Sequence, residues 1–189
     1  MRRKAAELIS LVFAPQIYGG AVGLMLWSSA GGSLDALAVL VLTLTVLPLL
    51  SILVSVRKGE VDIFVSEREK RGKYYLLSLL SYMLGIVYTL WRGYTLYAIL
   101  CLSYALSAAT LAAITVVLKW KISVHTAGIA GPTTALVCAL GPECAPLFLL
   151  LIPVAWARHE LKAHTPSQLA AGALTATVVT LAVFKMLGA

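Results

Sequence analysis

The sequence predicts an all-α membrane protein, a polytopic bundle of about six to seven transmembrane helices in a single domain. Hydrophobic residues make up 60% of the 189 residues and charged residues only 12%, and the mean hydropathy is +0.92. A soluble domain carries about 25% charged residues, because it needs them to cover its surface. The apolar residues form runs, and about 20 of them cross a bilayer core of ~30 Å. We therefore expect an integral membrane protein, embedded along most of its length.

The N-terminal part, residues 1–56, predicts two helices. The first covers residues 8–27 and contains Pro15, and the second covers residues 34–56 after a turn of small residues. The basic start followed by an apolar run is similar to a signal peptide, but no small-residue cleavage site follows closely. We therefore expect a retained first helix.

The remaining residues, 57–189, form the candidate functional core. A long polar loop at 57–73 precedes the apolar runs, which cover residues 74–90, 95–118, 126–140, 145–157 and 166–186. The third and fourth of these runs are shorter than the usual minimum of ~17 residues for a crossing helix. They either begin at depth beside a polar cavity or extend into the flanking polar segments.

Basic residues are distributed unevenly between the loops. If the chain crosses seven times, one side carries 13 of the 15 Lys and Arg residues, and only Arg92 and Lys185 fall opposite. Basic residues near span ends mark the cytoplasmic face. The polar loops are therefore expected in the cytoplasm.

All three histidines, His125, His159 and His164, fall on this same side, where two loops meet their helices. Ionisable groups at helix ends of a membrane protein suggest a functional site by default. Three segments with cations and histidines would converge there, at residues 66–73, 119–125 and 158–168.

These segments carry a family resemblance. Arg158, five residues, His164 and then Thr-Pro-Ser-Gln168 resemble the third signature of the type-2 phosphatidic acid phosphatases, which are membrane lipid-phosphate phosphatases related to the vanadium haloperoxidases. That signature reads Ser-Arg, five residues, His, three residues, Asp, so Ala157 and Gln168 depart from it. The second signature, Pro-Ser-Gly-His, aligns with Ser123 and His125.

The first signature of the family, Lys, six residues, Arg-Pro, aligns at Arg71-Gly72. Phe64 then stands at the position of the lysine, and Arg68 or Lys70 would supply the missing positive charge. The resemblance covers roughly residues 62–185 in order and spacing, with an additional helical hairpin between the first and second signatures. It therefore indicates a divergent member of the family.

The resemblance implies a metal-independent phosphatase of a lipid or isoprenoid phosphate, with no cofactor. His164 would be the nucleophile that forms a phosphohistidine, and His125 the general acid that protonates the leaving alkoxide. Gln168 would hold the His164 ring in place of the family's aspartate, supplying a hydrogen bond but no charge. The phosphate would be bound by Arg158, Arg71, Ser123, Lys121 and Arg68, because guanidinium groups match phosphate oxygens in pairs. Asp62, Glu67 or Glu160 could supply the missing negative charge.

Other interpretations stay open at this point. The family member could bind or transport a phosphorylated lipid without catalysis, or the chain could be an unrelated transporter or assembly factor. Arg158 and Lys162 could simply anchor helix ends at lipid head groups. The three cysteines are expected to be buried small hydrophobes rather than a disulfide or metal site. The expected partners are the bilayer and a phosphorylated lipid, not nucleic acid.

Overall fold

The computed structural model describes residues 1–188, and Ala189, the last residue of the predicted domain, lies outside them. Every regular element in the described residues is helical, as predicted. The elements are α1 (Arg2–Val12), α2 (Pro15–Ala30), α3 (Leu34–Val41), η1 (Leu42–Val46), α4 (Leu47–Arg57), α5 (Arg71–Trp91), α6 (Thr95–Ala112), η2 (Ala113–Val117), α7 (Val124–Leu140), η3 (Pro142–Leu150), α8 (Leu151–Glu160) and α9 (Pro166–Leu187). The elements η1 and η2 are π-helical turns that continue their neighbours, so that α3–η1–α4 and α6–η2 each form one long helix.

Four helices are long and apolar enough to cross a membrane: Leu34–Arg57, Arg71–Trp91, Thr95–Val117 and Pro166–Leu187. A fifth candidate is the pair α1 and α2, if this bent pair counts as one span. The helix α7 is apolar but shorter. The chain therefore has the helices of an integral membrane protein.

The predicted single helix at residues 8–27 is wrong in detail. The structure has a helix from Arg2, a break at residues 13–14, and a second helix that begins at Pro15 and turns by 45° from the first. Ala14 has an extended backbone, with ψ of 139°. The residue before a proline is disfavoured in the helical conformation, and proline itself fits the first position of a helix. Pro15 therefore starts α2 and sets the bend.

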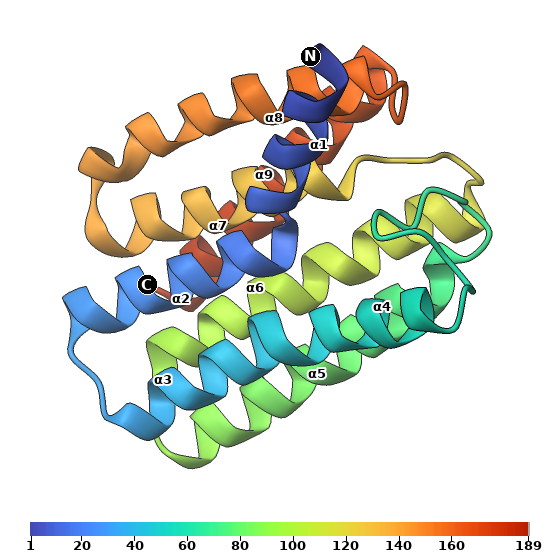
Figure 1. Cartoon of the computed structure of the whole chain (residues 1–189). Helices are drawn as coiled ribbons and strands as arrows, with labels where there is room; N and C mark the ends of the chain where they lie inside the picture. Colours follow the sequence, from blue (N-terminus) through green and yellow to red (C-terminus); the bar gives the residue numbers. More distant parts are fainter. Residues whose placement is uncertain (189) are drawn as a thin grey trace.

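The predicted helix at residues 145–157 also begins differently. Residues Pro142–Leu150 form a 3-10 helix with Pro146 inside it, and the α-helix starts only at Leu151 and continues to Glu160. Proline has no N–H to donate to the carbonyl four residues earlier, so it disfavours a regular α-helix in this stretch. The run from 142 to 160 lies antiparallel to α7 and packs on it (Figure 1).

The connections gather at two ends of the bundle (Figure 1). One end holds α1 and the loops 58–70, 118–123 and 161–165, and the other holds the turns at 31–33, 92–94 and 141. The loops that carry the histidines and most of the cations therefore lie at the same end.

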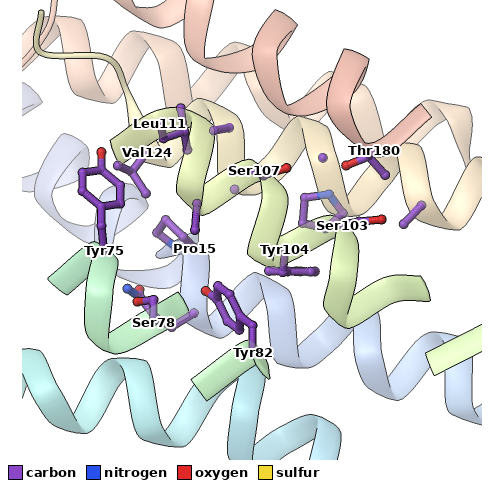
Figure 2. Close-up of a pocket in the computed structure, with 17 residues that line it drawn as sticks. Pro15, Tyr75, Ser78, Tyr82, Ser103, Tyr104, Ser107, Leu111, Val124 and Thr180 are labelled. Atoms are coloured by element: carbon purple, nitrogen blue, oxygen red, sulfur yellow. The ribbon is translucent and has the colours of Figure 1, made fainter. Parts of the chain in front are cut away.

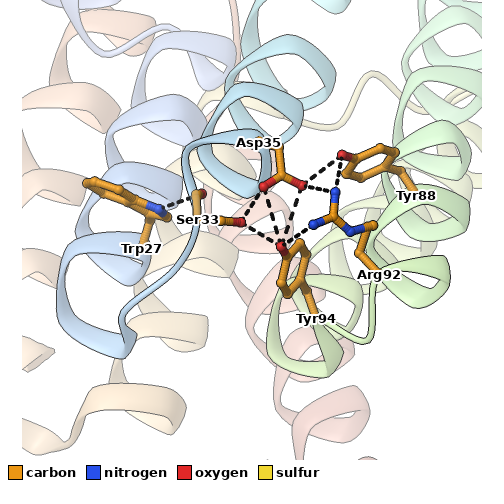
Figure 3. A network of polar contacts seen from close by, with 6 residues as sticks. All are labelled: Trp27, Ser33, Asp35, Tyr88, Arg92 and Tyr94. Carbon is orange, nitrogen blue, oxygen red and sulfur yellow. Dashed lines mark hydrogen bonds and ion pairs between the residues drawn. The ribbon is translucent and has the colours of Figure 1, made fainter.

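At the opposite end, a polar network joins the turn before α3 to the turn between α5 and α6 (Figure 3). Asp35 pairs with Arg92 at 2.6 Å and accepts hydrogen bonds from the hydroxyls of Tyr88 and Ser33. Tyr94 also donates toward Asp35. These groups satisfy one another, so this network fastens two helical hairpins together.

Small residues allow α9 to pack closely on α7. A Cβ atom added to Gly172 would lie 2.3 Å from the Ser123 carbonyl oxygen, and one added to Gly131 would lie 3.2 Å from the Ala176 side chain. Membrane helices approach each other most closely where small residues meet. These glycines therefore bring the start of α7 against the start of α9.

Candidate active site

Three loops of one end of the bundle form the site, and each has a residue with an unusual backbone. The non-glycine residues with positive φ in the described chain are Val65, Lys119 and Lys162, with φ of 47°, 54° and 53°. One lies in each loop. A positive φ is a genuine outlier for a β-branched residue such as valine. Strained residues of this kind cluster at functional sites, where the surroundings hold them in place.

Arg71 is held by backbone carbonyl groups of two of these loops. Its Nε donates to the Val65 oxygen at 3.0 Å and its Nη1 donates to the Ile122 oxygen at 3.1 Å. The side chain is 6% exposed, although the residue begins α5. The unusual backbone of Val65 thus presents a carbonyl group that fixes the direction of a buried guanidinium group.

Arg158, near the end of α8, is 1% exposed. Its guanidinium carbon lies 4.8 Å from the centre of the Phe64 ring. A cation stacked on an aromatic face is stabilised by the ring electrons. Its Nε and Nη1 groups are buried and have no hydrogen-bond partner among the residues that the structure describes. Buried donors without partners are rare in proteins and call for an explanation.

His164 follows α8 and is 5% exposed. Its Nδ1 lies 3.2 Å from both the Lys121 carbonyl oxygen and Oε1 of Gln168. Both partners are acceptors, so Nδ1 carries the proton and Nε2 of a neutral ring carries the lone pair. Nε2 is buried and has no partner within residues 1–188. His164 therefore has the tautomer that a histidine nucleophile needs.

Gln168 is fixed from a second direction. Its Oε1 accepts from the backbone N–H of Thr165 at 3.1 Å, and the Thr165 side chain caps the start of α9 in return. This reciprocal pair is a capping box. Gln168 thus links the start of α9 to the ring of His164.

His125 is the second residue of α7 and is 8% exposed. Its Nε2 donates to the carbonyl oxygen of Ser10 in α1 at 3.2 Å. The ring meets Phe64 edge to face, with centroids 6.0 Å apart. Phe64 therefore lies between His125 and Arg158, at the position where the sequence alignment expected a lysine.

The charges of this group act on one another. Burial lowers the pKa of His164 to about 3, and the positive charges of Arg71 and Arg158 act in the same direction. Lys121 adds to this effect, and the hydrogen bond to Gln168 opposes it. Burial and the same two arginines also lower the pKa of Lys121. The three cations and His164 therefore lie within electrostatic range of one another, and the charges of Asp62 and Glu69 partly oppose the effect by raising the pKa of Lys121.

Two of the predicted phosphate ligands have other roles. Arg68 is not brought to the group, because it pairs with Glu69 at 2.6 Å and donates to the Thr115 carbonyl oxygen. Ser123 is buried beside the group, where its hydroxyl caps α7 by accepting from the Thr126 N–H and its own N–H donates to the Gln168 carbonyl oxygen. Its contribution to the site is to hold α7 and α9 in position.

The three carboxylates considered as replacements for the family's aspartate do not contact His164 within the described part of the chain. Asp62 accepts from the N–H groups of Phe64 and Ser66, and Glu67 pairs with Lys70. Burial raises the pKa of Asp62, but these backbone hydrogen bonds outweigh it and the pKa is lowered overall. Asp62 therefore shapes the loop that carries Phe64, and Glu160 is exposed.

The site also uses residues that the sequence analysis did not single out. Phe64 packs on two site residues, Val65 holds Arg71, and the Ser10 carbonyl holds His125. An aromatic residue in a polar loop was a weak signal for Phe64. Backbone carbonyl groups have no sequence signal at all, so Val65 and Ser10 become visible only in the folded chain.

Residues of the site line two separate hollows. An apolar cavity of 140 Å³ between α2, α4 and α5 is lined by Phe64, Arg71 and His125 at its polar end and by Leu11, Ile17 and Ile52 farther out. An open polar depression on the other side is lined by Lys121, His164 and Gln168 together with His159 and Lys162. Site residues thus line one apolar hollow and one polar depression, and no residue lines both.

Comparisons of the chain with family models, with curated proteins and with solved structures found no match. We therefore infer the function from the positions and contacts of the side chains at the site. Four of the residues expected from the signatures, Arg71, His125, Arg158 and His164, lie together with Lys121 and Gln168 at one end of the bundle.

Proposed function

We propose that the protein is a membrane phosphatase that hydrolyses a lipid or isoprenoid phosphate through a phosphohistidine intermediate. The observation that supports this most is a set of three buried nitrogen atoms without partners in the described residues: Nε2 of His164 and Nε and Nη1 of Arg158. One is a nucleophilic lone pair and two are donors on a fixed cation. A phosphate group satisfies all three, because phosphorus accepts the nucleophile and its oxygens accept the hydrogen bonds.

Binding would rest on Arg158, Arg71 and Lys121. Arg71 donates its Nε and Nη1 groups to backbone carbonyl oxygens, so it would contribute to binding mainly through its fixed positive charge. Three cations around a dianion also favour the transition state, in which charge is spread over the phosphoryl oxygens. The positive potential that keeps His164 neutral thus has a use in both binding and catalysis.

In the first step, the lone pair on Nε2 of His164 attacks phosphorus and the bond between phosphorus and the lipid oxygen breaks. The electron pair of that bond leaves with the oxygen, which takes a proton from His125. For this role His125 enters the step as the imidazolium, a form that the negative charge of the bound phosphate stabilises, and its Nε2–H turns from the Ser10 carbonyl to the leaving oxygen, so that loss of the proton leaves a neutral ring. The products are the lipid alcohol and a phosphorylated His164.

In the second step, water attacks the phosphohistidine and the bond between phosphorus and Nε2 breaks. His125 accepts a proton from that water and regains the form with which it began. The electron pair returns to His164, and inorganic phosphate is released. This water would lie on the face of phosphorus that the alcohol has left, next to His125, and the polar depression beside His164, Lys121 and Gln168 would be the exit for phosphate.

The position of the two hollows supports an amphiphilic substrate. The leaving alcohol would lie on the side of His125, where the apolar cavity begins, and the transferred phosphoryl group on the side of His164, where the polar depression begins. A water-soluble phosphate ester would gain nothing from the apolar side. A lipid places its tail and its phosphate on the two sides that the site offers.

This function includes the family interpretation, a divergent type-2 phosphatidic acid phosphatase, and its membrane arrangement. In this arrangement α7 and the run from 142 to 160 also cross the bilayer, which gives seven crossings with the bent pair as one. The positively charged end, with the site, faces the cytoplasm. The placement of the loops at two ends of the bundle supports the seven crossings (Figure 1). The cations gathered at the end with the site support the orientation.

The first test is phosphate release from a panel of lipid and isoprenyl phosphates in mixed micelles. Release is expected from the purified protein and is expected to fall at least a thousandfold in His164→Ala, because that variant has no nucleophile. His159→Ala is the comparison for the loss of a different imidazole, since His159 lies in the wall of the polar depression but its exposed side chain makes no hydrogen bond in the described residues, and it should retain most of the release. Orthovanadate should inhibit the protein by mimicking the five-coordinate state.

The second candidate is a protein that binds or transports a phosphorylated lipid without hydrolysing it. One observation favours it: no carboxylate among the described residues contacts the His164 ring, so Nδ1 has only uncharged acceptors. Replacing the aspartate of a serine protease by an amide costs about 10⁴ in rate. Binding of lipid phosphate with no release from any substrate in the panel would establish this second function.

A further inference from the structure

We infer that Phe64 determines the specificity of the site, because it favours an uncharged leaving alcohol and disfavours a charged leaving phosphate. The site would then hydrolyse a lipid monophosphate in preference to the corresponding diphosphate. The inference rests on the proposed function, since it takes the transferred phosphoryl group to lie at His164 and Arg158. It goes further by assigning a role to Phe64 and by naming the charge of the leaving group.

The loop before α5 fixes the place of Phe64. Asp62 accepts hydrogen bonds from the backbone N–H groups of Phe64 at 2.8 Å and Ser66 at 2.9 Å. Val65 follows Phe64 with a φ of 47°, and its carbonyl oxygen accepts from Nε of Arg71 at 3.0 Å. The backbone is therefore bonded on both sides of Phe64. The loop that fixes Arg71 also fixes the position from which the Phe64 ring extends.

The Phe64 ring stabilises Arg158 without cancelling its charge. The guanidinium carbon lies over the ring, 4.8 Å from its centre, and Nε and Nη1 have no hydrogen-bond partner among the described residues. An aromatic face attracts a cation but supplies no oxygen atom to accept a hydrogen bond. A carboxylate in the same place would occupy the donors and neutralise the cation. Phe64 therefore leaves the charge of Arg158 for the transferred phosphoryl group.

The apolar hollow beside Phe64 and His125 offers little positive charge to a leaving group. Arg71 is the one Lys or Arg among the described residues that line it, and its Nε and Nη1 are bonded to backbone carbonyl oxygens. Lys121 lines the polar depression instead. A neighbouring cavity of 80 Å³ has only uncharged residues among those described in its wall (Figure 2). A second phosphate on this side would therefore have no cation of its own.

A leaving alcohol fits this arrangement better than a leaving phosphate. The alcohol oxygen takes a proton from His125 and departs uncharged. In a diphosphate, Nε2 of His164 would attack the terminal phosphorus, and the bond from that phosphorus to the bridging oxygen would break. The electron pair would stay on the bridging oxygen, and a lipid monophosphate would depart with negative charge beside Phe64. Burying an unpaired charge is costly, and the electron-rich face of a ring does not offset this cost.

The test uses two pairs of compounds that differ only in the second phosphate. They are dioctanoyl phosphatidate with dioctanoylglycerol diphosphate, and farnesyl monophosphate with farnesyl diphosphate. Initial rates in mixed micelles give kcat/KM for the first dephosphorylation of each. In every pair that the protein hydrolyses, kcat/KM for the monophosphate is expected to be at least roughly tenfold higher, although phosphate is the better leaving group in solution. Equal use of both compounds, or a preference for the diphosphate, would overturn the inference.

Variants of the same loop show whether Phe64 sets this preference. Phe64→Lys places a cation at the position of the ring, so it should shift the ratio of the two kcat/KM values toward the diphosphate by at least roughly tenfold. Ser66→Lys is the matched control, because it adds the same charge at an exposed position outside the hollow, and it should keep the ratio. Phe64→Leu retains an apolar wall, so it should also keep the ratio. The ratio is read within one preparation, so a partly unfolded variant does not change it.

Two results would show that Phe64 does not set the preference. One is a ratio that Phe64→Lys leaves unchanged, and the other is an equal shift in Ser66→Lys.

Dissociation constants separate this inference from the proposed function. They are measured in His164→Ala, which cannot form a phosphohistidine, with and without Phe64→Lys. The monophosphate is expected to bind at least as tightly as the diphosphate, and Phe64→Lys should reverse this order. That binding pattern without release by the unmodified protein would support the role of Phe64 and defeat the phosphatase. Equal release from monophosphate and diphosphate would support the phosphatase and defeat the role of Phe64.

Discussion

Gln168 shows how one residue can serve the helix and the site together. As the third residue of α9 it completes a capping box with Thr165, and the same oxygen lies 3.2 Å from Nδ1 of His164. The capping role alone would justify a glutamine here. The second contact ties the ring orientation of His164 to the start of a long helix, which is a more rigid support than a loop.

At the residue scale, the depressed pKa of His164 predicts a loss of stability in acid. The folded protein keeps His164 neutral down to about pH 3, whereas the unfolded chain takes up the proton below its ordinary pKa of 6.5. The unfolded state therefore binds more protons in this window, and stability present above pH 6.5 is lost as the pH falls toward 3. The loss should reach about 2 kcal/mol at pH 5. Thermal unfolding in detergent at pH 7, 6 and 5 measures it.

The control for this prediction is His164→Gln, which has a polar side chain that cannot take up a proton. It should be less sensitive to pH between 6.5 and 5 than the unmodified protein. Gln168→Glu should also reduce the sensitivity, since a carboxylate beside the ring raises the pKa of His164. Identical pH profiles for all three proteins would show that His164 is not held neutral.

At the element scale, the contact between α7 and α9 positions His125 and His164 relative to each other. Gly172→Ala would place a Cβ atom 2.3 Å from the Ser123 carbonyl oxygen, which is backbone and cannot move alone. We expect a destabilisation of about 1–3 kcal/mol, typical of an overpacked interface. Phosphate release should also fall, because separating the two helix starts shifts Gln168 away from the α7 loop. Thermal unfolding and the release assay measure the two effects.

Gly72→Ala is the matched control for this interface. Gly72 is the second residue of α5, and its added Cβ would meet Val116 at an ordinary contact distance of 3.6 Å. Alanine is the better helix former, so this variant should be as stable as the unmodified protein or slightly more stable. If both variants had the same stability, close packing at Gly172 would not be needed.

The sequence predicted helices better than it predicted where they change direction. The long apolar runs gave α5, α6 and α9 to within a few residues, because the length and composition of a membrane helix are set by the bilayer. Pro15 lies inside the predicted helix at residues 8–27, and a proline in such a run can either kink a helix or mark the boundary between two helices. Here it became a boundary because the helix before it turns to pack on α8. Such a choice depends on the neighbouring helix and not on the local sequence.

At the scale of the whole molecule, the spacing of the motifs and their placement on one side of the membrane predicted part of the site. The remaining site residues are visible only in the folded structure. Arg71, His125, Arg158 and His164 were predicted because cations and histidines recur on the loops of one side. Arg68 fits the same pattern, but in the structure it forms an ion pair with the neighbouring Glu69. Phe64 was not predicted as a site residue, because its side chain carries no charge. Only the fold shows that it packs on Arg158 and lies near His125.

The distribution of charge also makes a prediction about topology. With seven crossings, residue 66 lies on the side of the site, and residues 29 and 143 lie on the other side, since one crossing helix separates 29 from 66. Cysteines introduced as Ser66→Cys, Ser29→Cys and Glu143→Cys into a cysteine-free variant can be labelled with a membrane-impermeant maleimide on intact cells. We expect immediate labelling at positions 29 and 143, and labelling at position 66 only after the membrane is opened. The three positions are exposed in the structure, so access depends on the membrane alone.

Each departure from this pattern has its own meaning. Labelling of position 66 alone on intact cells would reverse the orientation and place the site outside, where it could act only on lipids of the outer leaflet. Labelling of positions 29 and 66 from the same side would contradict a crossing by Leu34–Arg57, the most apolar of the candidate spans. Protection of position 143 together with position 66 would mean that α7 enters the membrane and returns without crossing.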